Sequence, residues 1–390
     1  MAPAQIDIVL GGVPRFAAEA PWAWRLVHRY AALLPSGACT QTPGRRPIVA
    51  DASGQAPVVL VVADPESYLV PAAARRLLAA VQSSSGADVA VPVSNEPWAE
   101  EARAAVPFAY HTPTLLEEAA AAVAAAAAPV RPARDPRSAV FAVKRELLNG
   151  LPAALALDQV PEEAARLGRS VAIVPGAYLH RYGEMDGQAR ADLAAKLPEG
   201  ARSALDVGCA RGATAAALRA RGVQNVVGVE PDAGDAAEAA RVCDKVLAQP
   251  LEAVREEFPG AFDAVLFGDV LEHLEDPSAA LARVRPWLSS RGRVVASVPN
   301  MGHWSVVTDL LAGRFDYVPY SLLSGTHIRF FTRATVTDLF EACGYCVEEI
   351  EGVRLPPSPL GAAALARLRS VPNASGDLDV VEFVVVARPR

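Results

Sequence analysis

Short apolar runs recur along the second half of the chain, and stretches with the helical spacing of apolar residues separate them. The apolar runs predict strands at 201–205, 223–229, 245–248, 262–269, 294–298, 346–350 and 380–386. The intervening patterns predict helices at 186–197, 213–220, 231–242, 277–289 and 332–342. Strands that alternate with helices are typical of a parallel sheet covered on both faces. The second half is therefore predicted to be an α/β domain.

The first half shows a similar alternation with a less regular pattern. Strands are predicted at 6–10, 58–62, 87–91, 138–143 and 170–174, and helices at 71–82, 115–128 and 158–167. A chain of 390 residues is long enough for two domains that each bury a core. We place the boundary after residue 183, which gives an α/β domain at 1–183 and a second domain at 184–390.

Charge and cysteine content narrow the class of protein. The net charge is -7 and the pI is about 5.5, which argues against a broad basic face for nucleic acid. The five cysteines are odd in number and scattered, as expected in a reducing compartment. No signal peptide is evident, and the alanine-rich run at 119–130 has twelve residues, too few to span a bilayer. We expect a cytoplasmic protein without a transmembrane segment or a nucleic-acid partner, and the oligomeric state stays open.

The stretch 205–212, L-D-V-G-C-A-R-G, joins the first strand of the second half to a helix. Its two glycines leave backbone bare at a helix start, where a ligand can approach closely. Eighteen residues past Gly212, the next strand ends on Glu230. An acid at the tip of the second strand of a doubly wound sheet is placed to accept both hydroxyls of a ribose. The two features together predict an adenosine-type ligand.

The glycine spacing identifies the kind of adenosine ligand. The loop reads D-x-G-x-x-x-G, so the G-x-G-x-x-G fingerprint of a dinucleotide site is absent. The loop resembles the first motif of class I S-adenosylmethionine-dependent methyltransferases, D-x-G-x-G-x-G, with Ala210 in place of the middle glycine. This resemblance implies a Rossmann-like seven-stranded methyltransferase fold with S-adenosylmethionine as cofactor. The cofactor-binding residues that we expect are Asp206, Gly208, Cys209, Ala210, Gly212, Glu230, Pro231, Gln249 and Asp269.

A second resemblance covers residues 200–350. The run D-V-L-E-H-L at 269–274 and the aromatic segment 303–332 resemble a branch of small-molecule and sugar O-methyltransferases common among bacterial cell-surface polysaccharide genes. That branch often has an acid a few residues before the later histidine, whereas this chain has Ser324 and Gly325 there. The resemblance implies an acceptor that is a sugar, a glycan precursor or another small molecule.

The chemistry of methyl transfer to an alcohol indicates which residues can be catalytic. The reaction is an in-line displacement, so the enzyme must hold the acceptor oxygen about 3 Å from the sulfonium methyl and exclude water. An alcohol also needs a base, and a neutral imidazole serves that purpose near pH 7. We name His327, His273 and Asp269 as catalytic candidates and His303 as a further one. Each histidine also has a structural alternative, which for His273 is to cap the helix or to fix the loop beside the cofactor. No metal ligands are expected.

The order of elements in the first half resembles part of a GT-A glycosyltransferase domain. In that family an acid-x-acid turn holds a metal and a nucleotide diphosphate, which by position would be Asp64 and Glu66. Asp158 would match the family's base, and His180 the last element of its site. Three possibilities stay open: a methyltransferase that carries an inactive domain of this kind, a bifunctional glycosyl- and methyltransferase, and a methyltransferase with a non-catalytic glycan-binding module.

Overall fold

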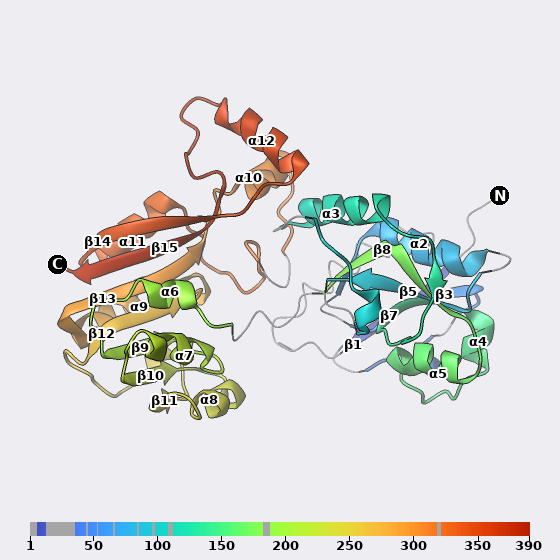
Figure 1. Cartoon of the computed structure of the whole chain (residues 1–390), viewed down its shortest axis with the longest axis horizontal. Coiled ribbons are helices and arrows are strands. Elements are labelled where there is room, and N and C mark those ends of the chain that lie inside the picture. Colours follow the sequence, from blue (N-terminus) through green and yellow to red (C-terminus); the bar gives the residue numbers. More distant parts are fainter. Residues whose placement is uncertain are drawn as a thin grey trace. The chain divides into compact units, whose positions relative to one another are not determined.

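The structure is a computed structural model, and it divides the chain into two compact units (Figure 1). It describes residues 6–12, 36–43, 46–52, 54–64, 67–83, 86–95, 98–107, 112–181, 188–317 and 321–390. The first unit comprises 1–183 and 316–325, and the second comprises 184–315 and 326–390. The segment 316–325 thus groups with the first unit, whereas the predicted boundary assigned it to the second domain.

In the described part of the second unit, seven strands form one sheet. They are β9 (Ser203–Val207), β10 (Asn225–Val229), β11 (Lys245–Leu247), β12 (Phe262–Gly268), β13 (Leu288–Pro299), β14 (Tyr345–Arg354) and β15 (Val380–Pro389). Their order is β11-β10-β9-β12-β13-β15-β14. Strands β9 to β13 pair in parallel, and β15 runs antiparallel to both β13 and β14. The predicted Rossmann-like α/β fold with seven strands is confirmed.

Helices cover both faces of this sheet because its strands are apolar on both sides. The described helices of the second unit are α6 (Ala191–Ala195), α7 (Ala213–Ala220), α8 (Ala233–Ala239), α9 (Pro277–Val284), α10 (Trp304–Leu311), α11 (Arg333–Ala342) and α12 (Pro359–Arg369). Of these, α10 and α12 pack on each other. Successive strand residues point to opposite faces. Ala204 of β9 packs with side chains of α6, α7 and α8, whereas Leu205 packs with side chains of α9 and α11. Ligands of open α/β sheets bind beyond the carboxyl ends of the strands, which here are the ends of β9, β10 and β12.

The structure corrects one predicted helix end. Helix α9 ends at Val284, a short 3-10 turn covers Arg285–Trp287, and β13 begins at Leu288. The predicted helix ran to 289, past Pro286, whose ring removes a helix hydrogen bond and clashes with the preceding turn. The strand predicted at 294–298 is correspondingly the second half of a longer strand.

Helix α12 and the short helix α6 also differ from the predictions. The apolar pattern did not reveal α12, which packs on α10 so closely that a Cβ on Gly361 would lie 2.5 Å from Cζ2 of Trp304. Helix α6 covers Ala191–Ala195 only, within a prediction of 186–197 whose first two residues lie outside the described residues.

The described residues of the first unit form a mixed sheet of eight strands. They are β1 (Ile6–Gly12), β2 (Ser36–Pro43), β3 (Val58–Val62), β4 (Ser67–Leu69), β5 (Val89–Ser94), β6 (Arg131–Pro132), β7 (Val140–Lys144) and β8 (Val171–Arg181). The order is β2-β1-β3-β7-β5-β8-β4, with β6 beside β8 and with β7 antiparallel to its neighbours β3 and β5. The helices of this unit are α2 (Pro71–Gln82), α3 (Pro113–Ala125), α4 (Arg145–Asn149) and α5 (Val160–Arg166). The predicted α/β class therefore holds here too.

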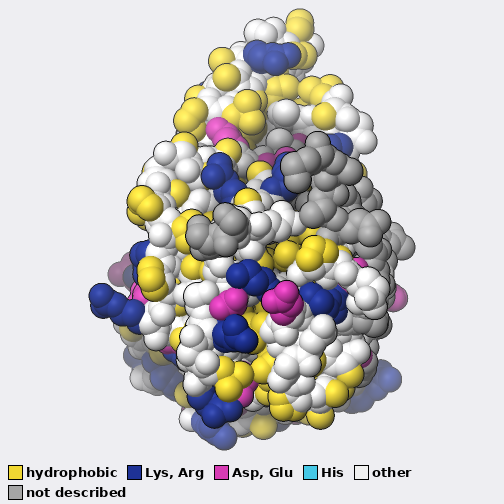
Figure 2. Space-filling model, turned by 90° about the vertical axis from the view of Figure 1, so that its right-hand side faces the viewer, with side chains coloured by type: hydrophobic (Ala, Val, Ile, Leu, Met, Phe, Trp, Pro, Cys, Tyr) yellow, Lys and Arg dark blue, Asp and Glu magenta, His cyan; other side chains and the backbone are white. Residues whose placement is uncertain are grey.

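Basic and acidic side chains lie interspersed on the face of the molecule drawn in Figure 2. Ion pairs on the surface of the first unit show the same mixing, such as Arg166 with Glu163 and Arg137 with Asp135. Among the residues that the structure describes, no helix is both long enough and apolar enough to cross a membrane.

Candidate functional site

The loop after β9 has a left-handed backbone at three positions. The φ angles are 70° at Gly208, 44° at Ala210 and 79° at Gly212. At Gly208, an added Cβ would lie 2.6 Å from Cγ2 of Val270, and at Gly212 it would lie 2.6 Å from Cγ2 of Val242. The two glycines are therefore required both by the turn and by the close approach of neighbouring side chains.

Glu230 follows β10 and fixes this loop. Its Oε2 accepts a hydrogen bond of 2.9 Å from the Ala210 amide, and its Oε1 accepts one of 2.8 Å from the Asp232 amide. The side chain is buried, and burial raises its pKa. Each carboxylate oxygen has a second lone pair, so the group can still accept a hydrogen bond from a ligand hydroxyl.

Asp206 is the penultimate residue of β9, just before this loop, and it is 5 % exposed. Burial, and then the negative charge of Glu230, raise the pKa of Asp206 to about 7. Two buried carboxyl groups that repel each other are stabilised by a cationic ligand between or beside them. The loop therefore suits a ligand that carries positive charge.

Asp269 follows β12 with a φ of 55°, unusual for a residue that is not glycine. Its amide donates to Oγ of Ser297 at 2.9 Å, and the Ser297 hydroxyl donates to Oδ1 at 2.8 Å. Arg190 donates to Oδ2 of Asp269. The exposed carboxylate is thus held at the carboxyl end of the sheet, with its direction fixed by two partners.

Arg190 joins several acids at this end of the sheet. Its Nη2 lies 2.7 Å from Oε1 of Glu382 and 2.7 Å from Oδ2 of Asp192, and its Nη1 donates to Ser297 at 2.9 Å. Burial, and then the charge of Asp269, raise the pKa of Glu382 to about 7. This network could not be predicted from the sequence, because Arg190 and Glu382 are nearly two hundred positions apart.

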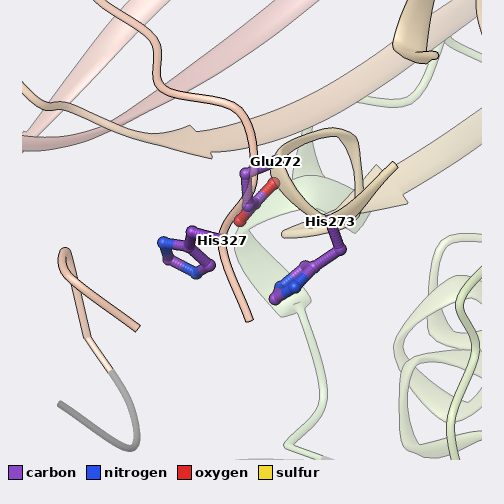
Figure 3. A group of neighbouring side chains, drawn as sticks. All are labelled: Glu272, His273 and His327. Carbon is purple, nitrogen blue, oxygen red and sulfur yellow. The ribbon is translucent and has the colours of Figure 1, made fainter. Parts of the chain in front are cut away.

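A second group of side chains contains two of the predicted catalytic histidines (Figure 3). Glu272 and His273 belong to a 3-10 turn, Leu271–His273, and one ligand atom from each of Glu272, His273 and His327 lies within 4.8 Å of the others. The two imidazole rings meet edge to face with centroids 4.8 Å apart. His273 Nδ1 lies 3.2 Å from the carbonyl oxygen of Thr326. The predicted candidates His273 and His327 are therefore brought together.

Glu272 was missed in the sequence, where it stands between the predicted residues Asp269 and His273. The residue is fully buried, and burial together with the charge of Asp269 raises its pKa well above the usual range. In the run D-V-L-E-H, Glu272 stands three residues after Asp269 and directly before His273, but this spacing does not indicate that its carboxylate is buried.

The other predicted residues take different positions. His303 caps helix α10: its Nδ1 accepts from the Ser305 amide at 3.4 Å and lies 2.8 Å from the Ser305 hydroxyl. Cys209 is buried in the loop, Pro231 is exposed beside Glu230, and Gln249 is half-buried after β11. The structural alternative for His303 therefore describes its place, and its role as a helix cap is visible only in the structure.

The residues matched to the glycosyltransferase pattern lie in the first unit. Asp64 accepts hydrogen bonds from Arg181 Nε at 2.9 Å and from Ser67 Oγ at 2.8 Å, and Glu66 lies outside the described residues. Asp158 forms an ion pair with Arg46 at 2.6 Å. His180 pairs with the β4 residue Tyr68 across the sheet, and burial lowers its pKa to about 3.

Comparison with protein families decides the class of the second unit. Residues 178–350 match the family described as "Methyltransferase domain". These residues form a methyltransferase domain. The predicted enzyme class is confirmed, and S-adenosylmethionine is the methyl donor that this class of domain uses.

Curated proteins and solved structures resemble the same part of the chain. A ubiquinone biosynthesis O-methyltransferase of Psychrobacter arcticus is 29% identical over 166 residues, which cover 40% of this chain and 63% of that protein. The protein of the same name from Azorhizobium caulinodans is 28% identical over 188 residues, or 46% of this chain and 69% of that protein. A solved S-adenosylmethionine-dependent methyltransferase from Mesorhizobium loti is 21% identical, with a TM-score of 0.36, and the match covers 50% of this chain and 95% of that one.

Proposed function

We propose that the chain is an S-adenosylmethionine-dependent O-methyltransferase that methylates a hydroxyl of a small-molecule acceptor. The observation that carries this proposal is the hydrogen bond from the Ala210 amide to Glu230, which ties the turn after β9 to the tip of β10. This bond places a buried carboxylate next to the exposed backbone of the glycine-containing loop. Such a site suits a cationic ligand with ribose hydroxyls. The O-methyltransferase names of the matched relatives support a hydroxyl as the acceptor group.

The acceptor that we propose is a sugar or glycan precursor. Phe315 and Phe330 pack edge to face with centroids 5.9 Å apart, and both stay more than a third exposed. Exposed aromatic faces suit the apolar faces of sugar rings, and such a pair is a common element of binding surfaces. The names of the relatives support an alternative acceptor, a hydroxyl on a precursor of ubiquinone.

For the first unit we propose a non-catalytic, glycan-binding role with a GT-A-like fold. Two of the carboxylates that a glycosyltransferase site would use are occupied by arginines: Asp64 by Arg181 and Asp158 by Arg46. A carboxylate engaged by an arginine must first give up that ion pair before it can hold a metal or accept a proton from a substrate. A thermal shift by a nucleotide sugar that Asp64→Ala abolishes would favour the bifunctional enzyme instead.

The test of the proposed function is a transfer assay with methyl-labelled S-adenosylmethionine. The full chain is incubated with panels of sugar nucleotides, glycans and hydroxylated quinone precursors, and mass spectrometry follows the gain of one labelled methyl group. We expect transfer to a sugar hydroxyl that Glu230→Ala greatly reduces and that the exposed Glu252→Ala leaves unchanged. Transfer to a quinone precursor alone would favour the alternative acceptor, and no transfer to any panel member would contradict the proposal.

A further inference from the structure

Glu272 has an environment that an acid rarely occupies without a counterion. Glu272 is fully buried, and neither of its carboxylate oxygens has a hydrogen-bond partner among the residues that the structure describes. An unpaired buried carboxylate costs several kcal/mol, so such groups are normally paired, protonated or bound to a metal. Among the residues that the structure describes, no group donates a hydrogen bond to this carboxylate, so the site can accommodate a further partner.

The turn that carries Glu272 is held rigidly in place. The backbone carbonyl of Glu272 accepts hydrogen bonds from the amides of Ile328 at 2.9 Å and Arg329 at 3.0 Å. The same segment carries His327, so these bonds fix the spacing between the turn and the second histidine. The group is built from two chain segments that are locked together, which is what a preorganised ligand site requires.

The chemical nature of the three side chains indicates which partner fits. One carboxylate and two imidazoles form a donor set that binds divalent transition metals such as zinc, iron or manganese and leaves coordination positions open. Ligand atoms at about 2.1 Å from one ion lie roughly 3 to 3.5 Å from each other. The three ligand atoms lie within 4.8 Å of one another, so metal binding requires the side chains to move closer together.

The group of Glu272, His273 and His327 is partly accessible to solvent. His327 is buried at 9 % exposure, whereas His273 is exposed, so the group reaches solvent through His273. Asp269, three residues before Glu272, lies on the same end of the sheet but is engaged by Arg190 and Ser297. The candidate ligand group is therefore Glu272, His273 and His327, without Asp269.

We propose that Glu272, His273 and His327 bind a divalent transition-metal ion whose open position takes the acceptor hydroxyl. The second part rests on the proposed O-methyltransferase function. Coordination lowers the pKa of a hydroxyl, as it does for water, and so replaces a strong base. The O–H proton then leaves to solvent, the oxygen forms a bond to the methyl carbon, and the carbon–sulfur bond breaks to release neutral S-adenosylhomocysteine.

A shared proton is the competing explanation for the same group. A protonated Glu272, or a positively charged imidazole beside it, would also relieve the buried charge. That arrangement needs no metal and binds none specifically. Direct metal titration therefore separates the two explanations.

The experiment uses the full chain after treatment with a chelator and removal of the chelator. Calorimetric titration with Zn²⁺ and Mn²⁺, and the visible absorption of added Co²⁺, report binding without any substrate. We expect one ion per chain and a Co²⁺ spectrum that shows nitrogen coordination. Glu272→Gln, His273→Ala and His327→Ala should each weaken binding by roughly a hundredfold or more, since even residues that only orient ligands contribute ten- to a hundredfold.

Two matched controls make the result specific. Glu275→Gln changes an exposed acid near the same turn, and His303→Asn removes an imidazole while keeping a good helix cap. Both should bind metal as the unchanged chain does, and a thermal melt checks that every variant folds. Absence of binding, or binding that survives His273→Ala combined with His327→Ala, would overturn the site.

The two parts of the proposal fail separately from the proposed function. If metal binds but chelation leaves transfer to the identified acceptor unchanged, the role of the ion in hydroxyl activation is wrong. If metal binds and S-adenosylmethionine does not, the metal site stands and the methyltransferase proposal fails.

Discussion

The amide of Ala210 donates a hydrogen bond of 2.9 Å to Oε2 of Glu230, a residue twenty positions further along the chain. This bond connects the loop after the first strand of the methyltransferase sheet with the tip of the second strand. Glu230 therefore shapes the loop through this bond, and its remaining lone pairs can accept hydrogen bonds from a ligand.

Removal of the Glu230 carboxylate should weaken cofactor binding. Glu230→Ala frees the amides of Ala210 and Asp232 and also removes the hydrogen bonds that we expect Glu230 to make with the ribose hydroxyls. A lost hydrogen bond to a charged group costs about 1.5 to 3 kcal/mol, so the Kd for S-adenosylmethionine should rise roughly ten- to a hundredfold. Calorimetry on this variant and on the exposed control Glu252→Ala checks the expectation. An unchanged Kd in Glu230→Ala would place the ribose elsewhere.

Gly208 should tolerate no side chain beside Val270. A left-handed backbone at a residue with a Cβ costs roughly 1 to 2 kcal/mol, and the Cβ would also lie 2.6 Å from Cγ2 of Val270. Gly208→Val should therefore lower both stability and affinity for S-adenosylmethionine, and Gly208→Ala should lower stability less. Val270→Ala should recover part of the loss in the Gly208→Ala background but none of the backbone cost. Urea unfolding of the four chains measures this coupling, and strictly additive effects would argue against the contact.

The stability of the ligand-free chain should depend on pH through Asp206. The carboxyl of Asp206 has a pKa of about 7 in the folded chain, whereas an unfolded aspartate ionises near pH 4. Between these values the folded chain holds a proton that the unfolded chain has released, so stability falls as pH rises from about 4 to 7 and stays reduced above that. Asp206→Asn should remove this part of the dependence in unfolding experiments at about pH 5 and about pH 8. Identical pH dependence in the two chains would contradict the assigned pKa.

His327 should matter for turnover more than for cofactor binding. His327 lies in the group with Glu272 and His273. The predicted cofactor site is a different set of residues, the loop with Gly208 and the carboxylate of Glu230 that is bonded to it. His327→Ala should leave the Kd for S-adenosylmethionine nearly unchanged while turnover on the identified acceptor falls roughly a hundredfold or more, the effect expected when a group that activates the acceptor hydroxyl is lost. Full turnover in this variant would make the residue structural and would favour His273.

The sequence revealed the elements that depend on local pattern. The seven strands and the loop between β9 and α7 follow from apolar runs and glycine spacing, which are properties of neighbouring residues. The end of helix α9 was misjudged because its apolar pattern continues past Pro286, and the backbone constraint of the proline prevails over the pattern.

The parts that escaped prediction depend on contacts between distant residues. Arg190 binds Asp269 and Glu382 from a place where the sequence shows only an isolated basic residue. Glu272 reads as one polar position in an amphipathic turn, and only the fold reveals that its carboxylate is buried beside two histidines. Burial of a polar group is a tertiary property, so a single sequence cannot reveal it.

The most direct test of the central claim is calorimetric titration of the full chain with S-adenosylmethionine and, separately, with NAD. The account predicts that one S-adenosylmethionine binds per chain, that Glu230→Ala weakens this binding, and that NAD gives no heat because the dinucleotide loop is absent. Saturable binding of NAD, or absence of S-adenosylmethionine binding to a chain that unfolds cooperatively, would contradict it.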